Sequence, residues 1–274
     1  MLIAVGRTYR TSNKNKQKIM LTLVQNKIKK MFEPSLKIRI MPLKKQIELG
    51  TDYAGYVIPE YLLNRNTVYY SVGAGEDISL DIEIANRYNP VIHIFDPTPR
   101  SKTHFEITKE NALNDKPNII SKKYQYPTTP KTFLKTVFEE IGVWNEKTTL
   151  KFFQPANDAH VSHSITNLQT TEKYLEVSVD TLSNIMRERN HTEIDMLKMD
   201  IEGAEFAVVR DIFDRKIPIK FICLEYHRQG KTPIKDIQAS IDLFEANDYV
   251  AIAADVDLLE FSFLRRDVYD KLNF

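Results

Sequence analysis

Glycine and acidic residues with the spacing of a cofactor site follow one short apolar run of this 274-residue sequence. Gly73 and Gly75 come directly after residues 68–72, and Glu76 and Asp77 follow them. Glycine lets the backbone turn tightly and approach a ligand at the start of a helix. The pattern therefore predicts a ligand-binding turn between a strand and a helix.

The residues after the glycines discriminate between two cofactors. The dinucleotide pattern GxGxxG needs a third glycine at the position of Ile78. Glu76 and Asp77 also place two negative charges where a pyrophosphate would bind, and like charges repel. S-adenosylmethionine (SAM) has no phosphate and carries an ammonium and a sulfonium group, so the turn suits SAM better than NAD. Both acids are equally compatible with a structural role at the helix N-terminus.

Asp96 follows the next apolar run, 23 residues after Gly73. An acidic side chain near this spacing can accept hydrogen bonds from both hydroxyls of a ribose. Aspartate before proline is also a common turn former, so a structural role stays open. The pair of Gly73 and Asp96 is more specific than either residue alone.

A third group of polar residues follows two later apolar runs. Asp200 and Glu202 come after residues 195–199, and Glu225 and His227 come at the end of residues 221–227. We expect Asp200 to face the same crevice as Gly73, and Asp200 or His227 to act as a general base. Asp200, Glu225 and His227 are also compatible with a divalent cation, but they follow no metal-binding spacing, so a metal is not favoured. Glu205 is expected to start a helix.

The densest histidine cluster lies at residues 160–164. In an extended chain, alternation would place His160, Ser162 and Ser164 on one side and His163 on the other, so the two histidines need not act together. A structural role is the more frequent one for a single histidine. The sequence contains no P-loop, GxSxG or HExxH pattern.

These residues need an α/β scaffold. Strands are predicted at 68–72, 91–95, 150–153, 175–179, 195–199, 221–225, 249–253 and 260–264, with helices at 78–85, 181–189 and 202–213. Residues 97–130 hold five of the 12 prolines and are expected to be irregular. The alternation predicts an open, mostly parallel, doubly wound sheet with a C-terminal antiparallel strand pair.

Charge is distributed unevenly behind a net value of +1. Residues 1–45 hold 12 Lys or Arg and one acid, so they carry +11 and the remainder carries −10. Residues 14–32 have the spacing of an amphipathic helix. We therefore divide the chain into a basic N-terminal helical segment, 1–52, and a catalytic domain, 53–274. The apolar stripe of the helix is expected to pack on that domain, with a membrane surface or an anionic partner as the alternative.

Composition excludes several classes of protein. The hydrophobic fraction of 42% is enough for a sizeable core, and a single cysteine, Cys223, excludes an internal disulfide and a CxxC zinc site. Apolar runs near the start are too short for a membrane span or a signal peptide. We expect a cytoplasmic protein without a transmembrane segment.

Five blocks of the sequence, in order, resemble the FkbM family of SAM-dependent methyltransferases. They are YSVGAGEDIS at 70–79, FDPTPR at 95–100, HVSHSI at 160–165, LKMDIEGAE at 197–205 and CLEYH at 223–227. The resemblance covers about residues 53–264, and LKMDIEGAE is its most specific part. The stretch 101–146 and the segment before Tyr53 depart from the family pattern.

The resemblance implies a Rossmann-like methyltransferase fold, SAM as the methyl donor and, most often, O-methylation of sugars or other hydroxylated metabolites. It implies cofactor contacts at Gly73, Gly75, the adjoining acids Glu76 and Asp77, and Asp96. It further implies a functional role for Asp200, Glu202 and His227. A small-molecule or glycan acceptor is expected, and a nucleic-acid partner is not favoured.

Two other classes remain as alternatives. A non-catalytic SAM-binding or interaction module would retain the glycine turn and lose the candidate bases, whereas this chain keeps Asp200, Glu202 and His227. An NAD-dependent oxidoreductase is opposed by Ile78 and by the acids of the turn. The acceptor and the oligomeric state cannot be read from the sequence.

Overall fold

The computed structural model describes residues 36–51, 54–120, 124–153, 174–227, 234–257 and 259–273. The chain divides into two units, Met1–Leu36 and Lys37–Phe274, and the fold below is that of the second. The helix expected at 14–32 and the histidine cluster at 160–164 lie outside the described residues.

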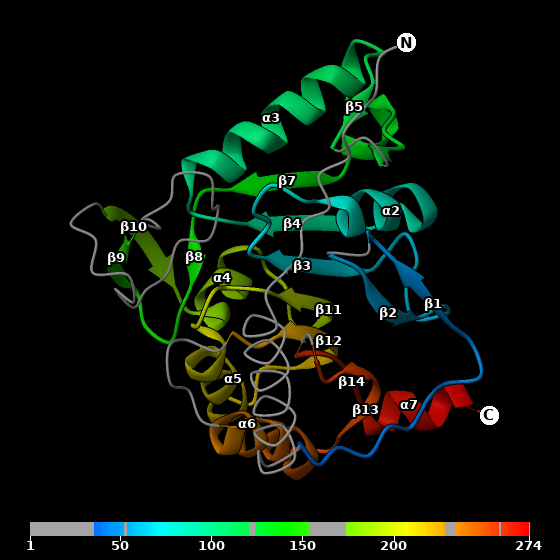
Figure 1. Cartoon of the computed structure of the whole chain (residues 1–274), viewed down its shortest axis with the longest axis vertical. Helices are drawn as coiled ribbons and strands as arrows, with labels where there is room; N and C mark the ends of the chain where they lie inside the picture. The colour runs from blue at the N-terminus through cyan, green and yellow to red at the C-terminus, as the bar shows by residue number, and fades with distance from the viewer. Residues whose placement is uncertain are drawn as a thin grey trace, which may run out of the picture. The chain divides into compact units, whose positions relative to one another are not determined.

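A seven-stranded sheet forms the centre of the second unit. Its order is β13-β14-β12-β11-β3-β4-β7, and Figure 1 shows β7, β4, β3, β11 and β12 one below the other. The strands span Val68–Val72 (β3), Val91–Phe95 (β4), Thr136–Glu139 (β7), Ile194–Met199 (β11), Ile219–Glu225 (β12), Tyr249–Asp255 (β13) and Glu260–Arg265 (β14). In this sheet β14 is antiparallel to both of its neighbours, β12 and β13, and the other pairs are parallel. The expected mostly parallel sheet with a C-terminal antiparallel pair is therefore confirmed.

Helices connect the parallel strands in the manner of a doubly wound sheet. They span Ser79–Tyr88 (α2), Pro99–Leu113 (α3), Leu182–Glu188 (α4), Glu205–Asp214 (α5), Ile234–Ala246 (α6) and Arg266–Asn273 (α7), with a 3-10 turn at Pro130–Phe133 (η1). Among the described residues, no helix is long and apolar enough to cross a membrane. The Rossmann-like α/β architecture predicted from the sequence is the one observed.

Burial of the central strands explains why these segments form strands. Every side chain of β11 except Asp195 is buried, and β12 is buried over most of its length. Near-continuous apolar runs of this kind are typical of parallel strands covered on both faces. Helix α5 contributes Val208, Val209 and Ile212 to the core from one face, as its amphipathic spacing requires.

Three small sheets flank the central one. Strands β8 (Gly142–Val143), β9 (Thr148–Phe153) and β10 (Tyr174–Asp180) form the order β8-β10-β9. The predicted strands at 150–153 and 175–179 therefore exist but lie outside the central sheet. Strands β5 (Asn118–Ile119) and β6 (Gln125–Tyr126) form a short antiparallel pair.

The last small sheet pairs β1 (Gln46–Leu49) with β2 (Tyr56–Pro59). This pairing spans the division that we placed between residues 52 and 53. The Met41 amide also donates a hydrogen bond to the Ala251 carbonyl of β13, at 2.7 Å. Residues 37–52 are therefore part of the second unit.

The expectation that residues 97–130 are irregular is wrong for nearly half of that stretch. Thr98 is the N-cap of α3, and its side chain accepts a hydrogen bond from the Ser101 amide. Pro99 occupies the first turn, where proline is favoured because its missing N–H is not needed. Pro99 therefore starts a helix and does not break one. Only a few side chains of α3, such as Phe105 and Ala112, are buried.

The central sheet reverses its winding between β3 and β11, and the backbones come very close there. Gly73 has a φ of 79°, and a Cβ atom on it would lie 1.7 Å from the carbonyl oxygen of Asp200. The Asp200 amide donates to the Val72 carbonyl at 3.0 Å. Only glycine fits at position 73.

A pair of alanine substitutions tests this constraint. Gly75 also has a positive φ, but a Cβ there would meet nothing within 4 Å, so Gly75→Ala should cost about 1–2 kcal/mol of unfolding free energy. Gly73→Ala must also displace the backbone of Asp200, and we expect a loss of about 3–5 kcal/mol. Urea unfolding measures both, and equal losses would contradict the proposed close approach.

Candidate functional site

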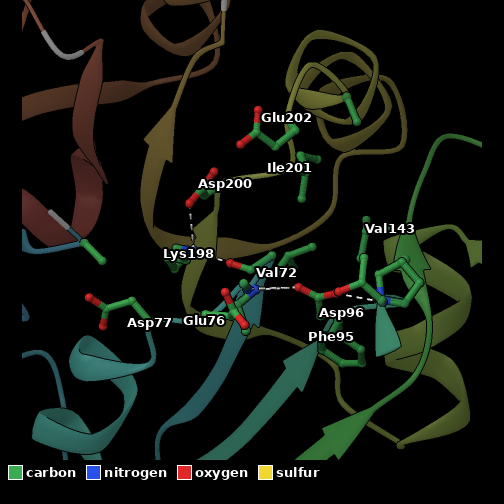
Figure 2. A pocket seen from close by; sticks show the side chains of 18 of the residues that line it. Val72, Glu76, Asp77, Phe95, Asp96, Val143, Lys198, Asp200, Ile201 and Glu202 are labelled. Atoms are coloured by element: carbon green, nitrogen blue, oxygen red, sulfur yellow. Dashed lines mark hydrogen bonds and ion pairs between the residues drawn. The ribbon is translucent and has the colours of Figure 1, made fainter. Parts of the chain in front are cut away.

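A cavity of about 640 Å³ lies beyond the carboxyl ends of β3, β4 and β11. In open α/β sheets this reversal point is where ligands bind. The lining contains seven of the residues predicted from the sequence: Gly73, Gly75, Glu76, Asp77, Asp96, Asp200 and Glu202. Figure 2 shows Asp96 on one side of Val72, with Asp200 and Glu202 on another.

The carboxylate of Asp96 holds the glycine turn in place by accepting hydrogen bonds from its backbone. Its Oδ2 accepts hydrogen bonds from the amides of Ala74 and Gly75, both at 3.0 Å. Its Oδ1 accepts from the amide and the hydroxyl of Thr98, at 2.9 and 2.6 Å. The side chain is buried, so these four bonds replace water around the carboxylate. The structure thus gives Asp96 a positioning role in addition to the ribose contact that its spacing suggests.

The two acids of the turn differ in their surroundings. Asp77 accepts a hydrogen bond from the Ser79 amide at 2.8 Å, at the start of α2, and another from the Thr51 hydroxyl at 2.8 Å. Glu76 forms an ion pair with Arg100 at 2.7 Å, and both side chains are about 40% exposed. The structural role at the helix start therefore applies to Asp77, while Glu76 is a partly exposed residue of the cavity lining.

Lys198 is a site residue that the sequence analysis missed. It lies within β11, 5% exposed, and its ammonium group donates to the Gly73 carbonyl and lies 3.4 Å from Asp200 Oδ2. Burial alone would lower the pKa of Lys198, but the carboxylates of Asp200 and Asp81 outweigh burial and raise it. The ammonium therefore links the glycine turn to Asp200. A lysine near the end of a mostly apolar strand was the available signal.

His227 lies among carboxylates at the ends of β11 and β12. Its Nδ1 donates to Glu205 Oε1 at 2.8 Å, and its Nε2 lies 3.7 Å from Asp200 Oδ1 and 3.6 Å from Glu202 Oε2. Glu225 Oε1 is 3.4 Å from the same nitrogen. The structure therefore brings together the residues predicted at this site, although His227 itself does not line the cavity.

Glu205 does more than start α5. Its side chain is fully buried, and Oε1 accepts from the Gly203 amide at 3.0 Å as well as from His227. Sequence reasoning assigned only the helix start because the contact with His227 joins residues 22 positions apart.

The acids of this site shift the pKa of their neighbours. Burial alone would lower the pKa of His227, but the hydrogen bond to Glu205 and the nearby Glu202 and Asp200 raise it to about 10. Burial raises the pKa of Glu225 to about 7, and the charge of Asp200 acts in the same direction. The shift of His227 against its burial indicates a negative potential at the ends of these strands.

Backbone conformation at the β11–α5 connection is unusual. Glu202 has a φ of 49°, and Gly203 has a φ of 101°. A left-handed conformation is uncommon outside glycine, asparagine and aspartate and costs roughly 1–2 kcal/mol. It turns the chain so that Asp200 and Glu202 both line the cavity.

The remaining cavity wall is largely apolar and was not predicted. It includes Ala54, Phe95, Ile120, Tyr124, Val143 and Phe152. These residues come from elements that are far apart in the sequence, such as β4, β8 and β9. Only the folded chain brings them together, so spacing carried no signal for this wall.

An open sheet of this order, with a cavity at its reversal point and an acidic glycine turn, defines a Rossmann-like cofactor-binding fold. The sequence profile of the methyltransferase FkbM domain matches residues 69–251, about two thirds of the chain. The chain belongs to the FkbM methyltransferase family, as the sequence blocks predicted.

Comparisons of structures give distant similarities. Fibrillarin, the pre-rRNA processing protein of Methanococcus jannaschii, is 10% identical over 74% of this chain and 68% of its own, with a TM-score of 0.38. Precorrin-6y C5,15-methyltransferase of Geobacter metallireducens GS-15 is 11% identical over 74% of this chain and 82% of its own, with a TM-score of 0.36. No curated protein matches the sequence significantly.

The bonds of Asp96 lead to a stability prediction. In Asp96→Asn, an NH₂ group replaces one of the two carboxylate oxygens. In either orientation of the amide, this NH₂ group faces two hydrogen-bond donors: the backbone amides of Ala74 and Gly75, or the amide and hydroxyl of Thr98. We expect a loss of roughly 2–4 kcal/mol, because buried groups are left unsatisfied. Glu76→Gln is the matched control, since its exposed ion pair contributes at most about 1 kcal/mol. Urea unfolding compares the two, and similar small losses would exclude the positioning role.

Proposed function

We propose that this chain is a SAM-dependent O-methyltransferase that acts on a hydroxyl of a sugar or another small hydroxylated metabolite. The observation that carries the proposal is the cavity with the glycine turn on one wall and Asp200 and Glu202 on another. Membership of the FkbM family supports the same donor.

The lining of the cavity fits SAM. The carboxylates of Glu76, Asp77 and Asp200 suit the ammonium and sulfonium charges, and the glycine backbone allows close approach. Lys198, the one cation among the described lining residues, is already engaged by the Gly73 carbonyl and by Asp200, so it is poorly placed to bind a pyrophosphate. When bound, SAM supplies an electrophilic methyl group and leaves as a neutral thioether.

Asp96 would act mainly by holding the turn that carries Gly73 and Gly75. A ribose hydroxyl that contacts its carboxylate would replace the hydrogen bond from the Thr98 hydroxyl, which is the most easily rotated of its four donors. The two amide bonds to Oδ2 would remain.

Asp200 is the residue that we propose for the acceptor hydroxyl. Its side chain is 31% exposed and lines the cavity, whereas His227 lies outside the lining. A carboxylate there can orient a hydroxyl and accept its proton, which contributes typically 10²–10⁴-fold to a rate. His227 and Lys198 would then position the carboxylate from its two sides.

The apolar wall would contribute by alignment. Phe152, Tyr124 and Val143 face a cavity whose polar groups gather at the strand ends. Such a wall reduces water around the reacting oxygen and restricts the orientations of a small acceptor. Methyl transfer needs an in-line approach, so this restriction favours the reaction.

Calorimetric titration separates the proposed class from its alternatives. We expect SAM and S-adenosylhomocysteine to bind with one site per chain, and NAD not to bind. Binding of NAD alone would contradict the proposal. A screen of sugars, nucleotide sugars and other hydroxylated metabolites for the mass gain of one CH₂ group then identifies the acceptor. Binding of SAM without transfer to any acceptor would favour the non-catalytic module.

Substitution of Asp200 tests its assigned role. Asp200→Asn keeps the size of the side chain but removes the proton acceptor, so we expect kcat to fall by about 10²–10⁴-fold. Glu188→Gln is the control, because this residue of α4 is 55% exposed and does not line the cavity. Steady-state rates of methyl transfer provide the measurement, and wild-type turnover in Asp200→Asn would remove Asp200 from the mechanism.

A further inference from the structure

Three potential ligand atoms meet at the edge of the cavity. One oxygen each of Asp200 and Glu202 and one nitrogen of His227 lie within 4.8 Å of one another. Two of these residues come from the β11–α5 connection and one follows β12, so neighbouring parallel strands bring them together. Among the described residues, this is the group whose geometry suits a metal ion.

Two of the separations within the group are close to those of ligands around one cation. The Nε2 atom of His227 lies 3.7 Å from Asp200 Oδ1 and 3.6 Å from Glu202 Oε2, which is too far for hydrogen bonds. Two ligands bound to one ion at about 2.0–2.2 Å with tetrahedral angles are roughly 3.3–3.6 Å apart. The observed distances are close to that range.

The imidazole is held in the orientation that a metal-binding histidine requires. Its Nδ1 donates to Glu205 Oε1 at 2.8 Å, which directs Nε2 towards Asp200 and Glu202. Histidines that bind metals almost always donate their other ring N–H to a carboxylate or a carbonyl in this way.

An independent observation concerns the carboxylate behind the ring. Glu205 is fully buried, and its Oε2 has no hydrogen-bond partner among the described residues. A buried carboxylate with an unsatisfied oxygen is costly unless a positive charge lies close by. A cation that replaces the proton on the far nitrogen of His227 would keep a positive charge on the ring beside this carboxylate.

We propose that Asp200, Glu202 and His227 bind one divalent cation of the Mn²⁺ or Zn²⁺ type. Imidazole and carboxylate together suit these ions, and three protein ligands leave a coordination position open. Asp200 and Glu202 line the cavity, so a ligand in that position can be reached from it.

The role of the cation rests on the proposed function, but its binding does not. In the open position the acceptor hydroxyl would bind as a fourth ligand and lose its proton more readily. That proton would pass to water, the oxygen would form the new bond to the methyl carbon, and the S–C bond would break. In the metal-bound chain, Asp200 would thus act on the hydroxyl as a ligand of the cation, in place of the direct proton transfer proposed for the metal-free site.

Binding of Mn²⁺ and of Zn²⁺ to the purified full chain, stripped with a chelator, is the direct test. Calorimetry should give one site per chain, and Asp200→Asn and Glu202→Gln should each weaken binding at least tenfold. Glu260→Gln is the matched control: it removes a neighbouring carboxylate of β14, outside the group of three, and should leave binding within about threefold. Thermal unfolding confirms that each variant is folded.

The outcomes separate this inference from the proposed function. Absence of a stoichiometric site, or equal weakening in all three variants, would overturn the metal site. Binding of SAM and full methyl transfer in the presence of chelator would overturn the catalytic role of the cation while supporting the proposed function. A specific metal site in a chain that does not bind SAM would support the metal site and contradict the proposed function.

Discussion

The close approach of Gly73 to Asp200 is the constraint on which the site depends. A single hydrogen atom is all that fits between the Cα of Gly73 and the carbonyl of Asp200. Because β3 and β11 are adjacent and parallel, this contact joins the ends of the two strands at the reversal point of the sheet. The cavity opens directly beyond it, and the ammonium of Lys198 joins the two sides.

Electrostatics at this edge follow from the same arrangement. Parallel strands place the acids that follow them at one end, and here Asp200, Glu202 and Glu225 gather around His227. The repulsion among these three carboxylates is compensated by the buried ammonium of Lys198 and by the ring of His227, which Glu205 holds in place. A site with this excess of negative charge suits positively charged ligands, and both the proposed methyl donor and the proposed divalent cation are of that kind.

The sequence predicted those elements and site residues that depend on interactions between residues close together in the chain. The strands that became β3, β4, β11 and β12 are short apolar runs that end at glycine or acidic residues, so their existence and the residues at their ends were readable. Strand β7 was missed because TVFE is short and partly polar. Helix α3 was missed because its prolines suggested a break, although Pro99 stands where a helix begins. The roles of Lys198 and Glu205 depend on contacts between residues far apart in the sequence, and no spacing rule encodes such contacts.

The central claim is that the cavity between the ends of β3 and β11 binds the methyl donor. A crystal structure of the chain with S-adenosylhomocysteine tests it most directly. The account predicts the ligand in this cavity, with its amino-acid end against the turn at Gly73–Gly75 and its sulfur facing Asp200. Ligand density elsewhere on the chain, with this cavity filled by solvent alone, would contradict the account.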